Sequence, residues 1–367
     1  MKQYARFICL FIALLGLFRP VYANDDLYSP RKSTGIYVQS LPVPDEVVLY
    51  MKQNIGRFLD PEFDKATIGT PFSIHNLDID KEIYYFPIIT RNTVIATYRV
   101  AQYNNQYTGV YSNVLSKELN SLSTTINNPA FFYAKAECII MVQGNKRSIV
   151  LSCGNSLESN LCESLQQYND SFGNYITVNC LQSVYTATPN QVQERAILSS
   201  YYTVPFATTA CSLEQQPNTL PWCSAYVAAF IVRCRSSNST TPTAYDVMTT
   251  VYPYETYVQL SSHALWDSDA RMYYQGLGYT VTLLSSYLSN STVISYINTD
   301  KPIHMLTAKL TPGANHSIAL VGYNTPNATY KVWNPWYSYL ELMDQTLRIY
   351  TAPTGDQYEW MWTITVS

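Results

Sequence analysis

Charged side chains are scarce in this sequence. Asp, Glu, Lys and Arg make up only 13% of its 367 residues, against about 25% in an average protein. The formal net charge is −3, and Lys and Arg form no run. The sequence therefore gives no electrostatic reason to expect a nucleic acid or an anionic membrane as a partner. Hydrophobic residues reach 47% and tyrosines number 33, which indicates a globular protein with a polar but weakly charged surface.

Long apolar runs are also missing, except near the N-terminus. The first 23 residues resemble an export signal, with Lys2 and Arg6 before the apolar stretch Phe7–Phe18 and a small-residue cleavage site, Val21–Ala23. The stretch is shorter than the roughly 20 residues that cross a bilayer. We expect a protein that is secreted, or periplasmic in a double-membrane bacterium, with no membrane attachment after cleavage.

Histidines are few, and no two of the four have the spacing of metal ligands. We therefore expect neither a metal nor another cofactor. The sequence also contains no internal repeat and no low-complexity tract.

The cysteine count is odd once the export signal is removed. Cys9 leaves with the signal, and seven cysteines remain, namely Cys138, Cys153, Cys162, Cys180, Cys211, Cys223 and Cys234. In an oxidising compartment an odd number leaves one thiol unpaired. Two bridges among the first four, a Cys211–Cys234 bridge and a free Cys223 would balance the count. The alternative is a set of mostly reduced, buried cysteines.

The first half of the chain is predicted to be rich in β-strands. Ile83–Ile89 and Thr93–Tyr103 flank a turn and predict a hairpin. Phe131–Val142 and Ser148–Cys153 predict a second hairpin, about a turn at 143–146. Residues 185–210 are polar and poorly patterned. We interpret them as a linker in which proteolytic maturation occurs.

The second half predicts helices followed by strands, which is an α+β arrangement. The expected helices are Pro221–Cys234, Tyr245–Tyr252 and Ser261–Leu277, and the expected strands are Ile303–Lys309, Ser317–Tyr323, Tyr330–Trp333 and Glu359–Val366. Three segments follow: a signal peptide at 1–23, a β-rich domain with its linker at 24–199, and a second domain at 200–367.

Cys223 stands in the first turn of a predicted helix. The free N–H groups and the dipole of a helix start favour negative charge, so this thiol is expected to ionise more easily than a free one. A buried core thiol is the alternative interpretation.

His316 and Asn334 are expected to lie side by side. A hairpin centred on Pro326 pairs residues whose numbers sum to 652, which places Asn334 opposite Ile318 and within two residues of His316. A cysteine, a histidine and an asparagine so arranged can perform acyl transfer. Trp336 would shield the histidine–asparagine bond from water.

The other histidines fit the role of base less well. His304 lies in an apolar strand, and His263 in a predicted helix without a polar partner. The Cys223 N–H can serve as one donor to an oxyanion. Gln216 is the best side-chain donor to it and Gln215 the second choice.

These blocks resemble the staphopain-like branch of the papain-like cysteine peptidases. The resemblance runs through residues 216–226 around Cys223, 315–322 beginning Asn-His-Ser-Ile, 332–336 with Asn-Pro-Trp, and 355–360. It implies a two-lobed papain-like domain and a secreted cysteine endopeptidase made as a zymogen. It further implies cleavage of proteins or peptides and inhibition by the enzyme's own propeptide at 24–199. We expect a monomer.

The chain departs from the family in one respect. The family's oxyanion glutamine stands six residues before the cysteine, where this sequence has Pro217. Gln216 is displaced by one residue.

Two other functions compete with the endopeptidase. A peptidoglycan amidase also pairs a helical cysteine with a histidine on a strand, although such enzymes lack the Asn-Pro-Trp block. A catalytically inactive secreted binding protein is the non-enzymatic alternative. Incubation with casein and with purified cell wall separates the first two, and labelling of Cys223 by a thiol reagent tests the third.

Overall fold

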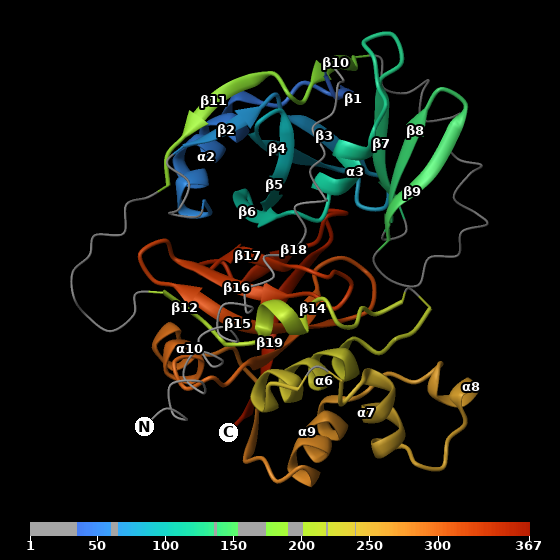
Figure 1. Ribbon diagram of the computed structural model, residues 1–367, viewed down its shortest axis with the longest axis vertical. Coiled ribbons are helices and arrows are strands. Elements are labelled where there is room, and N and C mark those ends of the chain that lie inside the picture. The colour runs from blue at the N-terminus through green and yellow to red at the C-terminus, as the bar shows by residue number, and fades with distance from the viewer. Residues whose placement is uncertain are drawn as a thin grey trace, which may run out of the picture.

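The computed structural model describes residues 35–59, 65–135, 138–152, 174–189, 201–217, 219–238 and 240–367. The predicted export signal, Cys153, Cys162 and the middle of the predicted linker lie outside these ranges. Within them, no helix has both the length and the apolar character needed to cross a membrane. We call residues 35–189 the N-terminal half and residues 201–367 the C-terminal half. Figure 1 shows the two halves stacked along the long axis of the molecule.

The N-terminal half consists mainly of strands. They are β1 (Tyr37–Ser40), β2 (Ala66–Gly69), β3 (Phe72–Asn76), β4 (Lys81–Thr90), β5 (Thr93–Tyr103), β6 (Gln106–Ser112), β7 (Ala130–Lys135), β8 (Cys138–Gln143), β9 (Lys146–Ser152), β10 (Ile176–Asn179) and β11 (Ser183–Ala187). The helices of its described residues are α2 (Asp45–Asn54), extended by a 3-10 turn at Ile55–Arg57, and α3 (Ser116–Ser121).

The first predicted hairpin is confirmed. Strands β4 and β5 pair antiparallel up to Thr90 and Thr93. Arg91 and Asn92 between them have φ values of 50° and 60°. A two-residue turn with both residues at positive φ matches the right-handed twist of the strands that it joins.

The second predicted hairpin is confirmed in part. Lys146–Ser152 (β9) pairs with β8 as expected. The segment Phe131–Val142, however, is not one strand. It folds back on itself as β7 and β8, which pair antiparallel from Phe131 opposite Val142 to Lys135 opposite Cys138. Folding back is favourable because both arms are apolar and bury each other, whereas a single strand of that length would exceed the usual 3–10 residues.

The C-terminal half combines one antiparallel sheet with helices. Its strands are β12 (Tyr201–Thr203), β13 (Val281–Leu284), β14 (Ile303–Lys309), β15 (His316–Asn324), β16 (Thr329–Trp333), β17 (Leu340–Asp344), β18 (Ile349–Thr351) and β19 (Gln357–Val366). Its helices are α5 (Ala207–Ala210), α6 (Cys223–Ser236), α7 (Ala244–Val251), α8 (Tyr257–Leu260), α9 (Asp267–Gly276) and α10 (Asn290–Ile297).

This half matches the predicted α+β class. The central strands run in the order β13, β19, β14, β15, β16 and β17, all antiparallel. The four predicted strands and the first two predicted helices are confirmed, with ends shifted by one or two residues. The third predicted helix, Ser261–Leu277, is too long. Its first residues form a loop after α8, and helix α9 begins only at Asp267.

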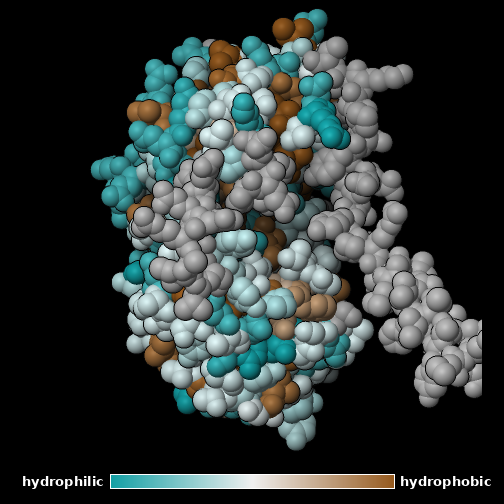
Figure 2. Space-filling view, turned by 60° about the vertical axis from the view of Figure 1, so that its left-hand side comes forward, coloured by the Kyte–Doolittle hydropathy of each residue, from teal (hydrophilic) through white to brown (hydrophobic). Residues whose placement is uncertain are grey.

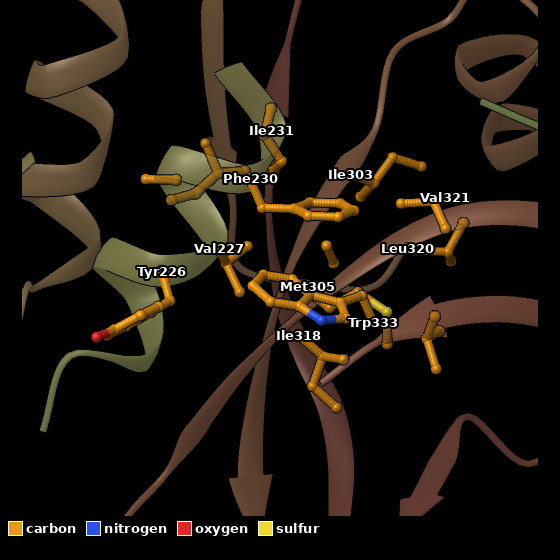
Figure 3. Close-up of a cluster of buried hydrophobic side chains, with 14 of the residues drawn as sticks. Tyr226, Val227, Phe230, Ile231, Ile303, Met305, Ile318, Leu320, Val321 and Trp333 are labelled. Atoms are coloured by element: carbon orange, nitrogen blue, oxygen red, sulfur yellow. The ribbon is translucent and has the colours of Figure 1, made fainter. Parts of the chain in front are cut away.

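Helix α6 forms the centre of the C-terminal core. Its eleven residues from Ser224 to Cys234 are all buried, as expected of a helix that is apolar on every side. Figure 3 shows Val227, Phe230 and Ile231 directed toward side chains of the sheet. The Phe230 ring stacks on Trp333, with centroids 4.4 Å apart.

Residues of the predicted linker belong partly to the C-terminal sheet. Strand β12 pairs antiparallel with the end of β15, with Thr203 opposite Gly322. A Cβ atom at Gly322 would lie 2.8 Å from the carbonyl oxygen of Tyr202. The glycine therefore permits the close approach of this strand.

The two halves are joined by a strand pair and by buried polar contacts. Strand β6 pairs antiparallel with β17. Arg57 forms an ion pair with Asp344 at 2.9 Å, and Asn76 donates to the Thr354 carbonyl at 2.6 Å. The N-terminal half thus packs on β17, β18 and the loop after them, and Figure 1 shows these strands at its lower boundary.

Candidate active site

Cys223 is the first residue of α6, at the point where the buried helix reaches the surface. Cys223 as a whole residue is partly exposed although its sulfur is buried, and the eleven residues after it are buried. Trp222 precedes the helix and is itself buried. Its indole N–H donates to the Leu260 carbonyl at 2.8 Å, which fixes the chain just before the cysteine.

The Cys223 sulfur lies against Ser317, the residue that follows His316 on β15. The N–H and the hydroxyl of Ser317, together with the N–H groups of Ser224 and Cys223, bond the sulfur and lower its pKa. Burial has the larger effect and raises the pKa of Cys223 above its ordinary value. The expectation of a more acidic thiol from the helix start alone is therefore wrong for this form of the chain, because desolvation of the thiolate outweighs the donors.

His316 and Asn334 are in direct contact. The His316 Nε2 atom lies 2.9 Å from the Asn334 Oδ1 atom, and both residues are buried. The predicted register is confirmed beside them, since Ala319 faces Trp333 and Leu320 faces Val332, pairs that each sum to 652. The hairpin therefore brings the two side chains together as the sequence indicated.

The hydrogen-bond partners of Asn334 fix the orientation of its amide and the tautomer of His316. The Asn334 Oδ1 atom also accepts from the Trp336 N–H at 3.1 Å, and the Nδ2 atom donates to the Tyr350 hydroxyl at 2.9 Å. The amide oxygen therefore faces the imidazole, so Nε2 carries the proton. This leaves Nδ1 free to accept a proton.

Trp336 covers the imidazole of His316. The two rings are stacked, with centroids 3.8 Å apart and planes inclined by 12°. The predicted shielding position of Trp336 is thus observed. Burial lowers the pKa of His316 to about 4, against an upward effect of the Asn334 bond and a further downward effect of Lys309. With the N-terminal half in place, burial therefore favours a neutral imidazole beside a neutral thiol.

The two candidate oxyanion donors differ in position. Gln216 is buried, and its N–H donates to the Pro335 carbonyl at 2.8 Å, which places it beside the segment that carries Asn334. Its side-chain amide donates to the Leu220 carbonyl at 2.6 Å. Gln215 is exposed and bonds within its own loop. The structure therefore brings Gln216, and not Gln215, next to the site.

The predicted Cys211–Cys234 bridge is wrong. Both cysteines are free thiols, although each is buried. The Cys211 thiol donates instead to the Thr208 carbonyl at 3.1 Å. Burial raises the pKa of both thiols, which makes them unreactive. The two bridges predicted among the first four cysteines are also wrong as a pair, because Cys180 is a free, buried thiol and two bridges would need all four. Cys153 and Cys162 lie outside the described residues.

The remaining histidines lie elsewhere. His304 is buried between Ser224 and Tyr274. His263 is not in a helix and has a polar partner, contrary to expectation, since its Nδ1 atom lies 2.8 Å from a Glu255 carboxylate oxygen. The His75 Nδ1 atom lies 2.6 Å from a Glu82 carboxylate oxygen in the N-terminal half. Among the residues that the structure describes, no group of three or more His, Cys, Asp or Glu side chains could hold a metal ion.

Sequence reasoning missed three residues behind Asn334. Tyr350 accepts from its amide, and the Tyr350 hydroxyl donates to Glu341 at 2.5 Å. Arg99 of β5 pairs with that carboxylate at 2.9 Å. A glutamate inside the apolar run Leu340-Glu341-Leu342-Met343 was the one available signal, because a buried carboxylate needs partners.

A cysteine at a helix start, with its sulfur against the residue that follows a histidine bonded to an asparagine, fits the arrangement of a cysteine peptidase. Residues 211–366 match the family described as staphopain peptidase C47. The match confirms the resemblance seen in the sequence and identifies this region as a papain-like cysteine peptidase of the staphopain family, a hydrolase. It covers less than half of the chain. No curated protein matches the chain.

Proposed function

We propose that the protein is a secreted cysteine endopeptidase made as a zymogen, with Cys223 as nucleophile, His316 as base and Asn334 as the residue that orients the imidazole. The observation that carries the proposal is the His316–Asn334 bond at 2.9 Å beside a sulfur that lies against Ser317. Protein or peptide substrates follow from the peptidase family of residues 211–366.

The chemistry follows from the fixed tautomer of His316. Its Nδ1 atom takes the thiol proton, and the sulfur of Cys223 attacks the carbonyl carbon of a peptide bond. The C–N bond then breaks, and the imidazolium gives its proton to the leaving amine. Water hydrolyses the thioester that remains, with the same imidazole as base. The Cys223 N–H and the Gln216 side chain are the proposed donors to the oxyanion.

We further propose that residues 24–199 are the inhibitory propeptide and that residues 200–367 form a papain-like catalytic domain of two lobes. Two observations support this division. Strand β12 starts at Tyr201 and pairs within the C-terminal sheet, and Val114 of the N-terminal half is buried beside Tyr337, in a cluster that also contains Trp336. The N-terminal half therefore contacts the segment that follows Asn334.

The surface is consistent with this class. On the face shown in Figure 2, most of the lower part of the molecule is pale, which means intermediate hydropathy. Side chains such as Tyr, Ser and Thr give such a surface and carry no charge.

The test is the replacement of Cys223 by alanine. Cleavage of casein and self-processing between residues 185 and 210 should both fall below detection, because the nucleophile is gone. Cys234→Ala is the matched control, since it removes another thiol from the same helix and should retain activity. Casein cleavage by the Cys223→Ala variant, at any rate above background, would refute the assignment. Release of cell-wall fragments without casein cleavage would favour an amidase.

A further inference from the structure

A continuous chain of buried hydrogen bonds connects His316 with the N-terminal half. It runs from the imidazole to Asn334 at 2.9 Å, from the Asn334 amide to Tyr350 at 2.9 Å, from the Tyr350 hydroxyl to Glu341 at 2.5 Å, and from Glu341 to Arg99 at 2.9 Å. All five side chains are buried. We call these residues the relay.

The direction of each hydrogen bond in the relay follows from the bonds on either side of it. Asn334 donates its amide proton to the Tyr350 oxygen, so the hydroxyl proton of Tyr350 goes to Glu341. Burial, and next the Glu341 carboxylate, raise the pKa of Tyr350 well above its ordinary value, so the hydroxyl remains a donor. Glu341 accepts the Tyr350 hydroxyl on Oε2 and the Arg99 guanidinium on Oε1.

Arg99 provides the charge that balances Glu341. Its side chain is 1% exposed and that of Glu341 is 0% exposed. Arg99 also donates to the Thr351 carbonyl, at 2.8 Å from Nε and 2.6 Å from Nη2. An unpaired charge at such depth is costly. The N-terminal half thus neutralises a carboxylate that belongs to the C-terminal half.

We propose that Glu341 and Tyr350 are positioning residues that hold Asn334, and through it His316, and that Arg99 cancels the negative charge of Glu341 for as long as the N-terminal half is bound. This inference rests on the proposed function. When Arg99 departs with the propeptide, the carboxylate stands unbalanced three hydrogen bonds from the imidazole. It then stabilises the imidazolium that forms in the reaction. The relay makes the base stronger in the mature enzyme than in the zymogen.

Other charged and titratable groups face His316. Lys309 of β14 lowers its pKa and is itself paired with Asp356 at 3.0 Å. Tyr358 of β19 has its ring centroid 5.5 Å from that of the imidazole, and the thiol of Cys223 lies against the adjacent Ser317. None of them is changed by the substitutions below, so a difference between variants reports on the relay.

The experiment measures the rate at which iodoacetamide alkylates Cys223 in the full-length protein as a function of pH, by mass analysis of the peptide that contains it. The upper limb of this profile reports deprotonation of the coupled Cys223–His316 pair, and a charge on the relay shifts it in the same direction as the pKa of the imidazole. Arg99→Met should move that limb to higher pH by about one unit, and Glu341→Gln should move it to lower pH by about one unit, since an unbalanced charge of opposite sign remains in each.

Tyr350→Phe completes the set because it breaks the relay but keeps the Arg99–Glu341 ion pair. It should lower kcat about tenfold to hundredfold with little change in KM, since the asparagine amide loses its partner. It should also remove most of the shift that Arg99→Met produces. Tyr330→Phe is the matched control, because Tyr330 is equally buried and donates to Asn290 at 2.5 Å, outside the relay.

Shifts of the same sign, or no shift, in correctly folded Arg99→Met and Glu341→Gln proteins would overturn the inference. If Arg99→Met does not fold, Glu341→Gln and Tyr350→Phe decide the question. If the variants show these shifts but the wild-type protein cleaves no peptide, the proposed function is refuted and the inference about the relay stands. If the wild-type protein cleaves peptides but the variants show no such shifts, the proposed function stands and the inference about the relay is refuted.

Discussion

Two buried histidines on neighbouring strands have very different surroundings. His304 on β14 is fully buried, and burial lowers its pKa to about 3. His316 on β15 is nearly as deep, with a pKa lowered to about 4. Burial and strand position therefore do not distinguish them. The polar neighbours of the two rings do.

Among the described residues, the hydrogen-bond partners of His304 are two neutral hydroxyl groups. Its two ring nitrogens lie 3.5 Å from the Ser224 hydroxyl and 3.3 Å from the Tyr274 hydroxyl. The ring meets Tyr274 edge to face, at 6.3 Å between centroids. Such a ring is satisfied as a neutral group, and neither hydroxyl carries a charge that would stabilise a positive one.

The surroundings of His316 fix one nitrogen and leave the other available. Its Nε2 atom is hydrogen-bonded to Asn334, and Trp336 covers the ring. The Asn334 amide in turn donates to the Tyr350 hydroxyl. Nδ1 is left for a proton that arrives from the thiol side. The comparison shows that a catalytic histidine is recognised by the connection behind it and not by its burial.

The largest expected effect comes from replacing each histidine by glutamine. His316→Gln should reduce kcat/KM on casein or a peptide substrate by about a thousandfold or more, because no group remains to take the thiol proton. His304→Gln should leave kcat within about threefold and affect stability instead. Steady-state kinetics on both variants test this, with circular dichroism as the check of folding. Equal losses of kcat/KM in the two folded variants would show that the two histidines do not differ in function.

The sequence was sufficient where contacts are local. The His316–Asn334 contact depends on one hairpin, so counting from Pro326 gave its register, and the apolar run after Cys223 gave the helix. Both are confirmed. The helix start also predicted a more acidic thiol, which failed because the depth of the sulfur is a property of the whole fold.

Long-range partners could not be predicted. Arg99 and Glu341 are 242 residues apart in the chain, and no pattern in either segment relates one to the other. The same holds for Ser317 and Cys223, which meet only because α6 packs on β15. The Cys211–Cys234 bridge, inferred from a count, failed for the opposite reason, since parity says nothing about where the thiols point.

The second prediction uses acid to sharpen the comparison. Both folded-state pKa values lie below the ordinary 6.5, so the unfolded chain takes up protons first as the pH falls. The contribution of each neutral ring to stability is complete above about pH 6.5, and is lost on the way down to about pH 4 for His316 and pH 3 for His304. The full loss should be about 3 kcal/mol for His316 and about 5 kcal/mol for His304.

Urea unfolding between pH 7 and pH 4 measures this effect, in the Cys223→Ala background to prevent self-digestion. As the pH is lowered from 7 to 4, the free energy of unfolding of the parent should fall more steeply than that of His304→Gln or His316→Gln. Carboxylates titrate in the same range but are common to all three proteins, so the difference isolates the imidazoles. Parallel curves for parent and variants would show that neither ring is neutral and buried in solution.

The smallest expected effect concerns the hydroxyl on the His304 side. Tyr274→Phe removes the contact with the His304 Nδ1 atom and keeps the ring that packs against it. The 3.3 Å separation makes this a weak bond, so the free energy of unfolding should fall by about 1 kcal/mol. Peptidase activity should be unchanged, because the only step from His304 toward Cys223 that the described residues show is a long 3.5 Å contact with the Ser224 hydroxyl, whereas the Cys223 sulfur is bonded by the Ser224 N–H. A change in the pH dependence of kcat/KM would mean that the two histidines are electrostatically coupled, and the contrast between them would then be one of degree.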